Sequence, residues 1–577
     1  MDRAHLRAGY GKLAALVLAI GIAWLSLRDR LLSPYWLLAP VAIFVLLAVL
    51  HEQVLGARAG AERAVAFYRH GLARLEDRWA GVAGGDAGER LRDPKHVYAE
   101  DLDLFGRGSL FELLSTARTP MGENRLADWL CSGSATGDIL ERQGLVAELR
   151  PKLDLREELA LAGEALRARL DPAGLVAWAE TPPELPLPFL RAVTGLLAIA
   201  AAGAALYALW SFVAWPLVVV LGLEIPFRLV LKQRALAAVT ALESSAEGLE
   251  LFSALMKRLE AESFASPRLR RLADDLRREI RPASRSLRQL ARIAYWIEAR
   301  DSFMIRPFDL PLLYTLQVGY AADNWRRRWG RRMRSWIDFL GEVEALVSLA
   351  AYSFEHPEDP FPEFVSEGGQ TPLFHGEELG HPLIPASRSV RNSILLGRES
   401  SVLLVSGSNM SGKSTLLRTV GINTVLAMAG APARAKRLRL VPLALGTRIR
   451  TTDSLQESRS GFYTEILRIR QVFDLAAGNA PLLFLFDELL EGTNSKDRRI
   501  GAEGLLRALI ARGAAGIVTT HDLALTEIVG AVGPAISNWH FQDYVENGRM
   551  RFDYKLREGV VARSNALELM RLIGLQV

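Results

Sequence analysis

The chain has 577 residues, of which 50% are hydrophobic and 23% are charged, and its formal net charge is +5. This length excludes a single hydrophobic core and predicts three or four structural units, while the small net charge gives no argument for nucleic-acid binding. The single cysteine, Cys131, excludes an intramolecular disulfide framework and a thiolate zinc site, as is typical of a reducing compartment.

Two uncharged apolar runs near the start of the chain predict a transmembrane hairpin over residues 1–53. The runs cover residues 13–27 and 31–50, and three charged residues separate them. Basic residues ahead of the first run resemble those of a signal peptide, but a small-residue cleavage site is missing and a second span follows at once. We expect an uncleaved anchor, and a buried pair of soluble helices is the alternative.

A second uncharged stretch, residues 192–223, exceeds the length of one membrane span. As a single helix it would be about 48 Å long, against a hydrocarbon core of about 30 Å. We therefore predict a second hairpin over residues 186–232 that turns between Trp210 and Pro216. Paired spans return the chain to its starting side, and basic residues flank the first hairpin. The soluble parts are therefore expected in the cytoplasm, and the chain in the cytoplasmic (inner) membrane as a multi-pass protein.

The rest of the chain divides into helical regions and a final α/β domain. Residues 54–185 and 233–364 carry leucine and alanine at three- and four-residue spacings, which predicts a cytoplasmic helical region and a helical lever or core region. Beyond a proline-rich break at residues 356–364, strand-like and helix-like runs alternate. This order predicts an α/β domain with a largely parallel sheet over residues 365–577.

A glycine-rich loop lies between a strand-like run, residues 401–405, and a helical run. Its sequence GSNMSGKST comprises Gly407, Ser408, Asn409, Met410, Ser411, Gly412, Lys413, Ser414 and Thr415. A P-loop requires this context, because its backbone N–H groups wrap phosphates at the start of a helix. Lys413 is predicted to neutralise the β- and γ-phosphates of ATP, and the Ser414 hydroxyl is predicted to bind Mg²⁺.

Two later strands end in candidate catalytic residues. The apolar run 482–486 leads into Asp487 and Glu488. Asp487 suits the Mg²⁺ shell, through water, and Glu488 suits the base that polarises the attacking water. A third run, residues 516–520, ends at His521, which is predicted to sense the γ-phosphate. A solvated acid pair and an unrelated histidine are the alternatives, and the P-loop upstream disfavours both.

Several of these segments resemble the MutS family of ATPases. The loop GSNMSGKST is similar to the MutS form of the P-loop, and DELLEGTNSKD at residues 487–497 is similar to that family's DE-x-x-x-GT-x-x-x-D. Residues 520–521 match its TH motif, and residues 451–465 resemble its D-x-L-x-x-x-x-S-x-F-x-x-E element. Residues 379–392 resemble the HP…VxN start of its ATPase domain, and residues 115–130 resemble the start of its helical core.

The resemblance implies a homodimer with composite ATP sites. In such dimers Ser460 would complete the partner's site in trans, and Asn494 and Ser495 would lie across the interface. Gly461 stands where mismatch-repair members usually have threonine, which is a departure at this contact. A mismatch-reading domain with its Phe-x-Glu wedge cannot be placed ahead of residue 13, and the second hairpin interrupts the helical core. We therefore expect that mismatches are not read as the repair enzyme reads them.

Residues 324–336 interleave arginines with Trp325, Trp329 and Trp336. Such a cluster suits phosphates of nucleic acid or of anionic lipid headgroups. Two of the tryptophans are four residues apart and share a helix face, so a packed helix with a solvated arginine face is the third interpretation.

The sequence thus predicts an ABC-type α/β P-loop ATPase domain, preceded by an all-α region and two transmembrane hairpins, that hydrolyses ATP with Mg²⁺ as a homodimer at the lipid bilayer. Two function classes stay open. The first is a DNA-binding ATPase of the mismatch-repair or recombination type without a mismatch reader. The second is a membrane mechanoenzyme or scaffold that acts on an unknown protein or lipid partner. A transporter is disfavoured because the predicted spans carry few polar residues.

Overall fold

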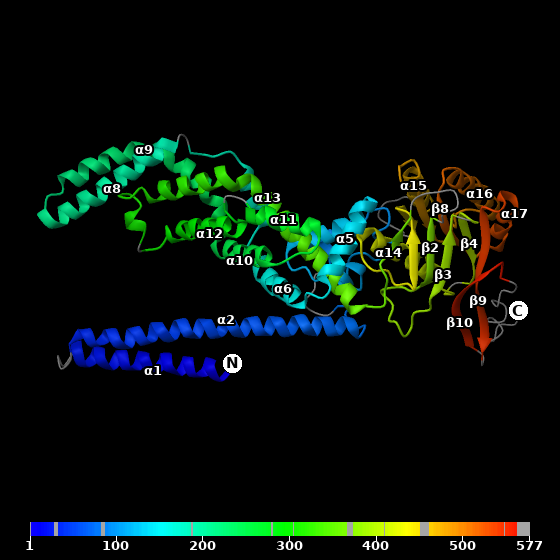
Figure 1. The fold of residues 1–577 in the computed structure, drawn as a ribbon, viewed down its shortest axis with the longest axis horizontal. Helices are drawn as coiled ribbons and strands as arrows, with labels where there is room; N and C mark the ends of the chain where they lie inside the picture. The colour runs from blue at the N-terminus through cyan, green and yellow to red at the C-terminus, as the bar shows by residue number, and fades with distance from the viewer. Residues whose placement is uncertain are drawn as a thin grey trace. The chain divides into compact units, whose positions relative to one another are not determined.

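The computed structural model of the chain describes residues 2–27, 33–81, 87–185, 188–278, 281–303, 305–365, 373–397, 399–408, 410–449, 461–546 and 549–561. The chain forms two compact units, residues 1–75 and residues 76–577. Figure 1 labels their helices and strands.

The first unit is a helical hairpin. Helices α1 (Asp2–Leu27) and α2 (Leu38–Leu75) lie along each other, and the short 3₁₀ helix η1 (Pro34–Leu37) precedes α2. The helix α2 does not end near residue 53, where the hairpin was expected to end, but continues for about six more turns. The cause is local, since residues 54–75 are rich in alanine, arginine and leucine, which are good helix formers.

The second unit starts with a helical region whose helices begin at local sequence signals. Ser109, Thr119 and Asp171 each accept a hydrogen bond from a backbone N–H in the first turn of the following helix, and proline opens two of these helices. The helices of this region are α3 (Leu110–Leu114), α4 (Pro120–Cys131), α5 (Thr136–Leu149), α6 (Leu153–Arg167) and α7 (Pro172–Glu180).

A second helical hairpin follows, formed by α8 (Pro188–Ser211) and α9 (Trp215–Val239). Its turn falls at residues 212–214, inside the range expected from the sequence. The helix α9 extends beyond the predicted boundary at residue 232, because Leu231 and Ala235 pack against the start of a later helix, α13.

Two helices among the described residues are long and apolar enough to cross a membrane, α2 and residues Phe189–Ser211 of α8. In the most apolar window of each helix, only 6% and 17% of the residues are buried. A core helix of a soluble protein would bury most of such a window, so the low burial disfavours the alternative of buried soluble helices. The four spans and the cytoplasmic membrane location stay predictions.

Four further helices complete the helical region: α10 (Ala246–Ala261), α11 (Pro267–Arg278), α12 (Ala283–Ala299) and α13 (Tyr314–Glu355). The helix α13 has 42 residues, which makes it about 63 Å long. It contacts α4, α5, α7, α9 and α12 and is therefore the central helix of this region.

The cluster of arginines and tryptophans lies on α13, and much of it is interior. Trp325 and Trp336 are each 1% exposed, and the Trp325 indole N–H donates to the Ser286 carbonyl oxygen at 2.8 Å. Arg326 is buried in an ion pair with Asp323. The structure therefore favours the packed-helix interpretation, and it contradicts a role for these three side chains in binding phosphates.

The α/β domain contains two sheets. The larger has the order β10-β9-β4-β8-β7-β6, with parallel pairing except between β9 and β10, and it agrees with the predicted largely parallel sheet. A smaller, mostly antiparallel sheet with the order β1-β5-β2-β3 was not predicted. The strands are β1 (Glu363–Phe364), β2 (Phe374–Leu379), β3 (Asn392–Leu396), β4 (Val402–Ser406), β5 (Arg437–Leu440), β6 (Ala444–Arg448), β7 (Leu482–Phe486), β8 (Ala515–Thr520), β9 (Ile536–Glu546) and β10 (Arg549–Glu558).

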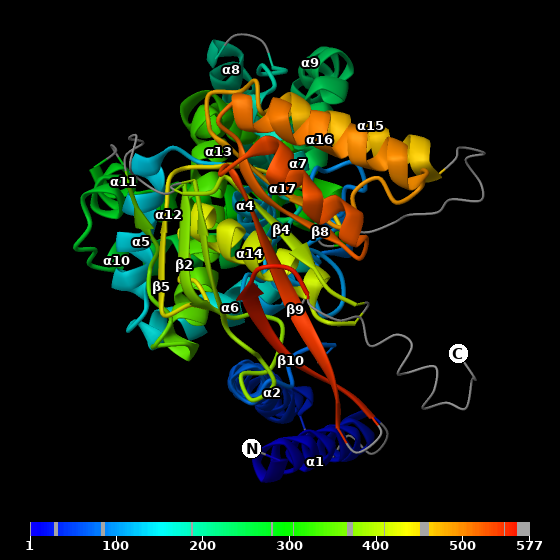
Figure 2. The ribbon, with the colours of Figure 1, turned by 90° about the vertical axis from the view of Figure 1, so that its right-hand side faces the viewer.

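Helices cover both faces of the larger sheet. Because side chains alternate along a strand, Leu403 and Val405 of β4 join the core that includes α14 (Lys413–Ala429), whereas Val402 and Leu404 join the core that includes α16 (Ser495–Ala511). Figure 2 shows these two helices on opposite sides of the strands. The remaining helices are α15 (Gly461–Leu475) and α17 (Ile528–Val532).

Two of the contacts between the helical region and the α/β domain position elements of the larger sheet. The Val97 carbonyl oxygen accepts a hydrogen bond from the Thr447 backbone N–H at 3.0 Å, so the chain before α3 covers the edge strand β6. Arg142 of α5 donates to the Ala429 carbonyl oxygen at 3.0 Å, at the end of α14, and its guanidinium lies 4.2 Å from the Trp129 ring centroid. The end of α14 is thereby tied to α4 and α5.

A carboxyl group is buried where α13 crosses α4 and α6. Glu344 is 3% exposed, and it accepts hydrogen bonds from the Thr119 hydroxyl and from the Arg118 backbone N–H. A Cβ atom at Gly122 or Gly163 would come within 3.0 Å of the Glu344 side chain, so both glycines make room for it. Burial raises the pKa of Glu344 from 4.5 to about 7, with a further contribution from Glu123.

We predict that Glu344→Gln changes how stability depends on pH. Folded chains hold a proton on Glu344 up to about pH 7 and unfolded chains only up to about pH 4.5. The stability of the wild type therefore falls across this window as pH rises, whereas glutamine stays neutral. The free energy of unfolding of the variant, relative to the wild type, should increase by about 3 kcal/mol between about pH 5 and about pH 8. Chemical unfolding of both detergent-solubilised proteins measures this, and parallel pH curves would contradict it.

Candidate nucleotide site

The glycine-rich loop joins a fully buried strand to a helix, as the sequence predicts. All five residues of β4 are buried, and α14 begins at Lys413. Gly412 has a φ of +104°, and a Cβ atom there would meet the Tyr554 ring at 3.1 Å. Both the backbone conformation and the close approach of the ring require glycine at this position.

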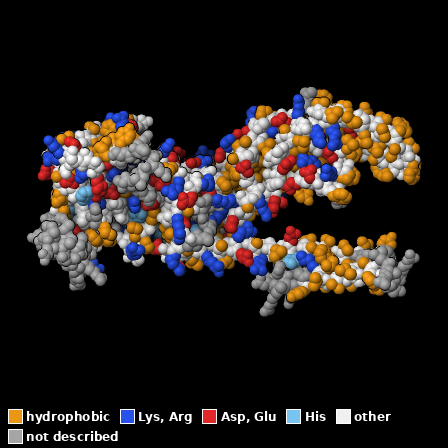
Figure 3. Space-filling view, turned by 180° about the vertical axis from the view of Figure 1, so that it is seen from behind, with side chains coloured by type: hydrophobic (Ala, Val, Ile, Leu, Met, Phe, Trp, Pro, Cys, Tyr) orange, Lys and Arg blue, Asp and Glu red, His pale blue; other side chains and the backbone are white. Residues whose placement is uncertain are grey.

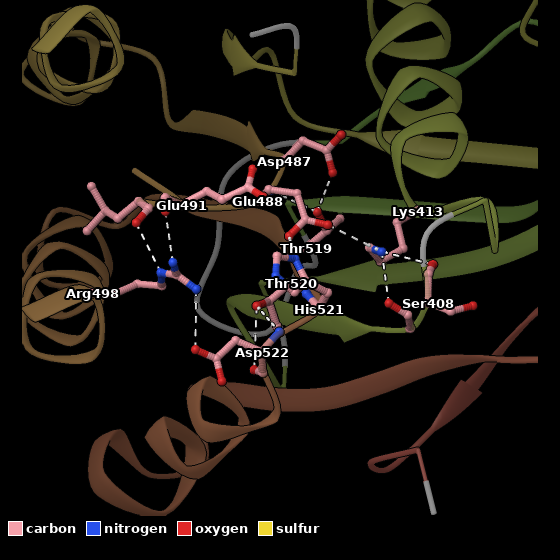
Figure 4. A network of polar contacts seen from close by, with 12 residues as sticks. Ser408, Lys413, Asp487, Glu488, Glu491, Arg498, Thr519, Thr520, His521 and Asp522 are labelled. Carbon is pink, nitrogen blue, oxygen red and sulfur yellow. Dashed lines mark hydrogen bonds and ion pairs between the residues drawn. The ribbon is translucent and has the colours of Figure 1, made fainter. Parts of the chain in front are cut away.

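Lys413 lies at the centre of the site. Its ammonium group donates to the carbonyl oxygens of Gly407 and Ser408 at 2.9 and 3.0 Å, and it lies 3.3 Å from a Glu488 carboxylate oxygen (Figure 4). The side chain is 5% exposed. A cation held in this way by the loop and by the acid of a neighbouring strand is placed to receive phosphate oxygens.

The predicted acid pair and the histidine come together at the ends of β7 and β8. Thr519 of β8 donates through its hydroxyl to an Asp487 carboxylate oxygen and accepts the Glu488 backbone N–H at 3.1 Å. The His521 Nδ1 atom lies 2.5 Å from the other Glu488 carboxylate oxygen (Figure 4). Glu488 is thus shared between Lys413 and His521, and Thr519 orients both acids.

A cleft of about 870 Å³ opens at the loop and is lined on its far side by the segment between β2 and β3. His381 of this segment is 8% exposed. Burial, with a contribution from Arg418, lowers its pKa to about 4, so the imidazole is neutral at physiological pH. Because its Nδ1 atom accepts the Leu383 backbone N–H at 3.2 Å, its Nε2 atom carries the proton and is a hydrogen-bond donor.

Tyr554 of β10 closes the cleft next to the loop. The Asn392 side-chain amide donates to the Tyr554 carbonyl oxygen at 3.0 Å, and its oxygen accepts the Leu556 backbone N–H at 2.9 Å. These bonds fall where the register of β9 and β10 shifts, and Tyr554 has a φ of 54°. The asparagine of the HP…VxN segment therefore fixes the tyrosine ring over Gly412.

Arg448, at the end of β6, holds the turn that carries the acids. Its guanidinium donates to the carbonyl oxygens of Asp487 and Glu488 and lies 3.3 Å from a Glu465 carboxylate oxygen. Glu465 in turn accepts the Leu490 backbone N–H at 2.8 Å. Arg448 and Glu465 are 6% and 4% exposed, so the pair is buried. Glu488 and Leu490 have φ values of 50° and 57°, a strained backbone that these bonds hold in place.

The other predicted site residues are distributed unevenly. Met410, Gly412, Ser414 and Thr415 line the cleft. Asn494 and Ser495 are exposed, and Asn494 caps α16 by accepting the Asp497 backbone N–H at 2.9 Å. Asn409 and Ser460 lie outside the described residues.

Sequence reasoning missed five side chains of this site: His381, Arg448, Glu465, Thr519 and Tyr554. His381 and Glu465 stand inside segments that resemble family motifs. The resemblance marked these segments, but it did not indicate what either side chain does. Arg448 and Thr519 carried none, because their function depends on contacts between strands that are distant in sequence.

The residues present suit ATP and Mg²⁺. The buried hydroxyl oxygens of Ser408 and Ser411 have no hydrogen-bond partner among the described residues, in a loop that also carries Lys413. Ser414 and Asp487 supply the hydroxyl and carboxylate oxygens that Mg²⁺ prefers. The loop, the acid pair two strands away and the histidine define a P-loop ATPase domain.

Comparison with known proteins places this domain in a family. Residues 403–576 match the family model described as MutS domain V. The chain is 34% identical to Endonuclease MutS2 of Thermus thermophilus over 203 residues, which is 34% of this chain and 25% of that protein. It is 30% identical to DNA mismatch repair protein MutS of Geobacillus kaustophilus over 253 residues, which is 42% of this chain and 27% of that protein. It is 31% identical to DNA mismatch repair protein MutS of Aquifex pyrophilus over 245 residues, 41% of this chain and 27% of that protein.

Residues 403–576 of this chain therefore form a domain of the MutS domain V type. The chain spans about a quarter of the length of the relatives it matches. The family model lies within the ATPase domain.

We predict that Arg448→Lys lowers ATP turnover at least about tenfold and leaves ATP affinity nearly unchanged. Lysine keeps the charge but cannot reach two carbonyl oxygens and Glu465 at once, so the turn that carries Glu488 loses its support. The loop that contains Lys413 is untouched. Steady-state turnover and the binding of a fluorescent ATP analogue measure the two effects.

Arg470→Gln is the matched control, because Arg470 forms an exposed ion pair with Asp474 and exposed pairs contribute about 1 kcal/mol or less. Arg448→Gln should also unfold more easily by about 3 to 5 kcal/mol, since it leaves Glu465 buried and unpaired. Unchanged turnover in Arg448→Lys would contradict the role of this side chain.

Proposed function

We propose that this chain is a Mg²⁺-dependent ATPase whose catalytic centre is formed by Lys413, Asp487, Glu488 and His521. The observation that carries the proposal is the Glu488 carboxylate, which lies 3.3 Å from Lys413 and 2.5 Å from His521 beside the cleft. The family model supports the reaction type, since the matched domain is a P-loop ATPase.

Each residue has a defined task in this proposal. Lys413 and the N–H groups at the start of α14 bind the β- and γ-phosphates. Mg²⁺, held by Ser414 and through water by Asp487, would neutralise phosphate charge. Glu488 orients the attacking water and accepts its proton, and Thr519 and Arg448 keep the acid in position. His521 holds one Glu488 oxygen and is placed to contact the γ-phosphate.

The active form proposed is a homodimer with composite ATP sites. Ser460 would act on the partner's nucleotide, and Asn494 and Ser495 would lie in the interface. The exposure of Asn494 and Ser495 supports this arrangement. ATP binding would close the two domains and hydrolysis would reopen them.

We propose further that the chain is anchored in the cytoplasmic membrane by four spans, with the ATPase in the cytoplasm. The low burial of the apolar windows in α2 and α8 supports the anchor. Contacts run from α14 to α4 and α5, from these to α13, and from α13 to α8 and α9. Motion at the nucleotide site can therefore reach the second hairpin through packed helices.

The proposed partner is DNA, without mismatch specificity. The support is the printed names of the relatives, an endonuclease and two DNA mismatch repair proteins. The alternative is a membrane mechanoenzyme or scaffold that acts on a protein or lipid partner, and the exposed apolar helices support it.

We predict that Glu488→Gln retains ATP binding and loses steady-state turnover by about a hundredfold or more, because the amide cannot accept the proton of the attacking water. Binding of a fluorescent ATP analogue and release of phosphate measure the two properties. Glu491→Gln, which changes an exposed acid three residues along the chain, is the control and should be active. Normal turnover in Glu488→Gln would sink the assignment of the base.

We predict ATP-dependent DNA binding by the detergent-solubilised protein, with an affinity that falls steeply as salt rises. Arg328 and Arg331 are two of the exposed arginines of the α13 cluster, whereas Arg326 is interior. If both contact phosphates, Arg328→Gln with Arg331→Gln lowers the slope of log affinity against log salt by about 2. Arg499→Gln with Arg507→Gln is the charge-matched control on α16. Intact ATPase activity without DNA binding would favour the membrane alternative.

A further inference from the structure

A positively charged hollow of about 410 Å³ lies beside the base of the second hairpin. It lies between α9, the end of α12 and the chain that leads to α13. Its charged lining consists of Arg228, Lys232, Arg300, Asp301, Arg306 and Asp309. Besides Asp301 and Asp309, Glu243 lies 3.3 Å from Arg300, so four cations stand against three carboxylates. The remaining excess of positive charge suits a ligand with an anionic group.

Several nitrogen atoms of this hollow are not used within the protein. Arg228 is paired with Asp309 at 3.2 Å, and Arg300 is paired with Asp301 at 2.9 Å. The Arg300 Nη1 atom is nevertheless buried with no hydrogen-bond partner in the described part of the chain. Lys232 and Arg306 form no ion pair with any described residue. A buried donor without a partner is costly, so a ligand that accepts from it would bind favourably.

Exposed aromatic side chains lie within five residues in sequence of the charged residues that line the hollow. Tyr295 and Trp296 occupy the last turns of α12 and are 66% and 50% exposed. Phe303 and Phe308, in the chain that leads to α13, are 94% and 54% exposed. Trp, Tyr and Phe next to basic side chains are the composition of a membrane–water interface, where rings lie at the level of the headgroups.

The hollow lies at the end of the apolar part of the second hairpin, where the headgroups of a bilayer would be. On α9, the buried Glu224 and then Arg228 and Lys232 follow the apolar run that starts at Trp215. Leu229 and Val230 are still largely exposed. Because Arg228 contacts Asp309, the aromatic segment lies where the apolar part of the hairpin ends. Figure 3 shows hydrophobic side chains gathered over the far end of the arm formed by α8 and α9.

We propose that this hollow binds the headgroup phosphate of an anionic phospholipid, and that Trp296, Phe303 and Phe308 insert into the interface around it. Lys232, Arg300 and Arg306 are the phosphate ligands. The proposal rests on the membrane insertion of the second hairpin proposed above. A nucleic-acid site of the same charge would not place exposed aromatic side chains against the apolar end of a helical hairpin.

The insertion is tested with a depth probe on the full chain in vesicles of phosphatidylethanolamine and phosphatidylglycerol. Cys131 is the only cysteine of the chain, so Cys131→Ser gives a background for Phe303→Cys, labelled with a polarity-sensitive fluorophore. Nitroxide lipids should quench the label and its emission should shift to the blue. Leu206→Cys on α8 reports the hairpin, and Ala511→Cys, exposed on α16, is the control in water.

The outcomes separate the two proposals. Quenching at positions 206 and 303 but not at 511 supports both. Quenching at 206 alone overturns the interfacial segment and leaves the anchor intact. Quenching at 303 alone supports the interfacial segment and overturns insertion of the hairpin, and no quenching at either position overturns both.

Headgroup binding is tested by counting the phosphatidylglycerol molecules that stay with the protein through detergent washing. Lys232→Gln with Arg306→Gln should lose most of the retained lipid. Arg285→Gln with Arg288→Gln removes the same charge from the exposed face of α12 and should retain it. If both double variants lose retained lipid equally, the effect is one of general charge and the site is overturned. The site is also overturned if phosphatidylcholine is retained as well as phosphatidylglycerol.

Discussion

Arg448 stabilises the turn after β7 through hydrogen bonds to the carbonyl oxygens of Asp487 and Glu488 and through its ion pair with Glu465. The geometry of the site depends on these contacts. The turn after β7 must leave the strand with left-handed backbone at Glu488 and Leu490, at a cost on the order of 1 to 3 kcal/mol for each residue. Hydrogen bonds from Arg448 to two carbonyl oxygens and from Leu490 to Glu465 offset this cost. The carboxylate of Glu488 is thereby directed to Lys413 and His521.

The same turn links the chemistry to its surroundings. Glu465 belongs to α15, which follows the segment expected to contact a partner subunit, and Arg448 ends β6, whose edge is covered by the chain before α3. The acid pair is therefore supported through Arg448, which is next to the helical region, and through Glu465, which is next to the proposed dimer interface. A change on either side acts on the orientation of Glu488 without touching the phosphates.

Much of the site could be predicted from the sequence because its motifs are local. The P-loop, the acid pair and His521 each follow a strand directly, and strand ends of a parallel sheet meet at one edge. Arg448, Thr519 and Tyr554 could not be predicted, since each acts through a contact with a segment at least 30 residues away. The smaller sheet was missed for the same reason, as it pairs β1 with β5 across the whole P-loop helix. The phosphate-binding role considered for the arginine and tryptophan cluster was wrong for its buried members, because residue spacing alone does not show which side chains face the core.

The continuous packing between α14 and the second hairpin has a thermodynamic consequence. Any coupling between two binding events is reciprocal. If the second hairpin lies in a bilayer, as proposed, and nucleotide binding moves α8 and α9 through Arg142 and α13, then bilayer thickness or lipid composition must change ATP affinity by the same factor. The membrane would then act as an effector of the enzyme, and ATP affinity measured in detergent would differ from that measured in a bilayer.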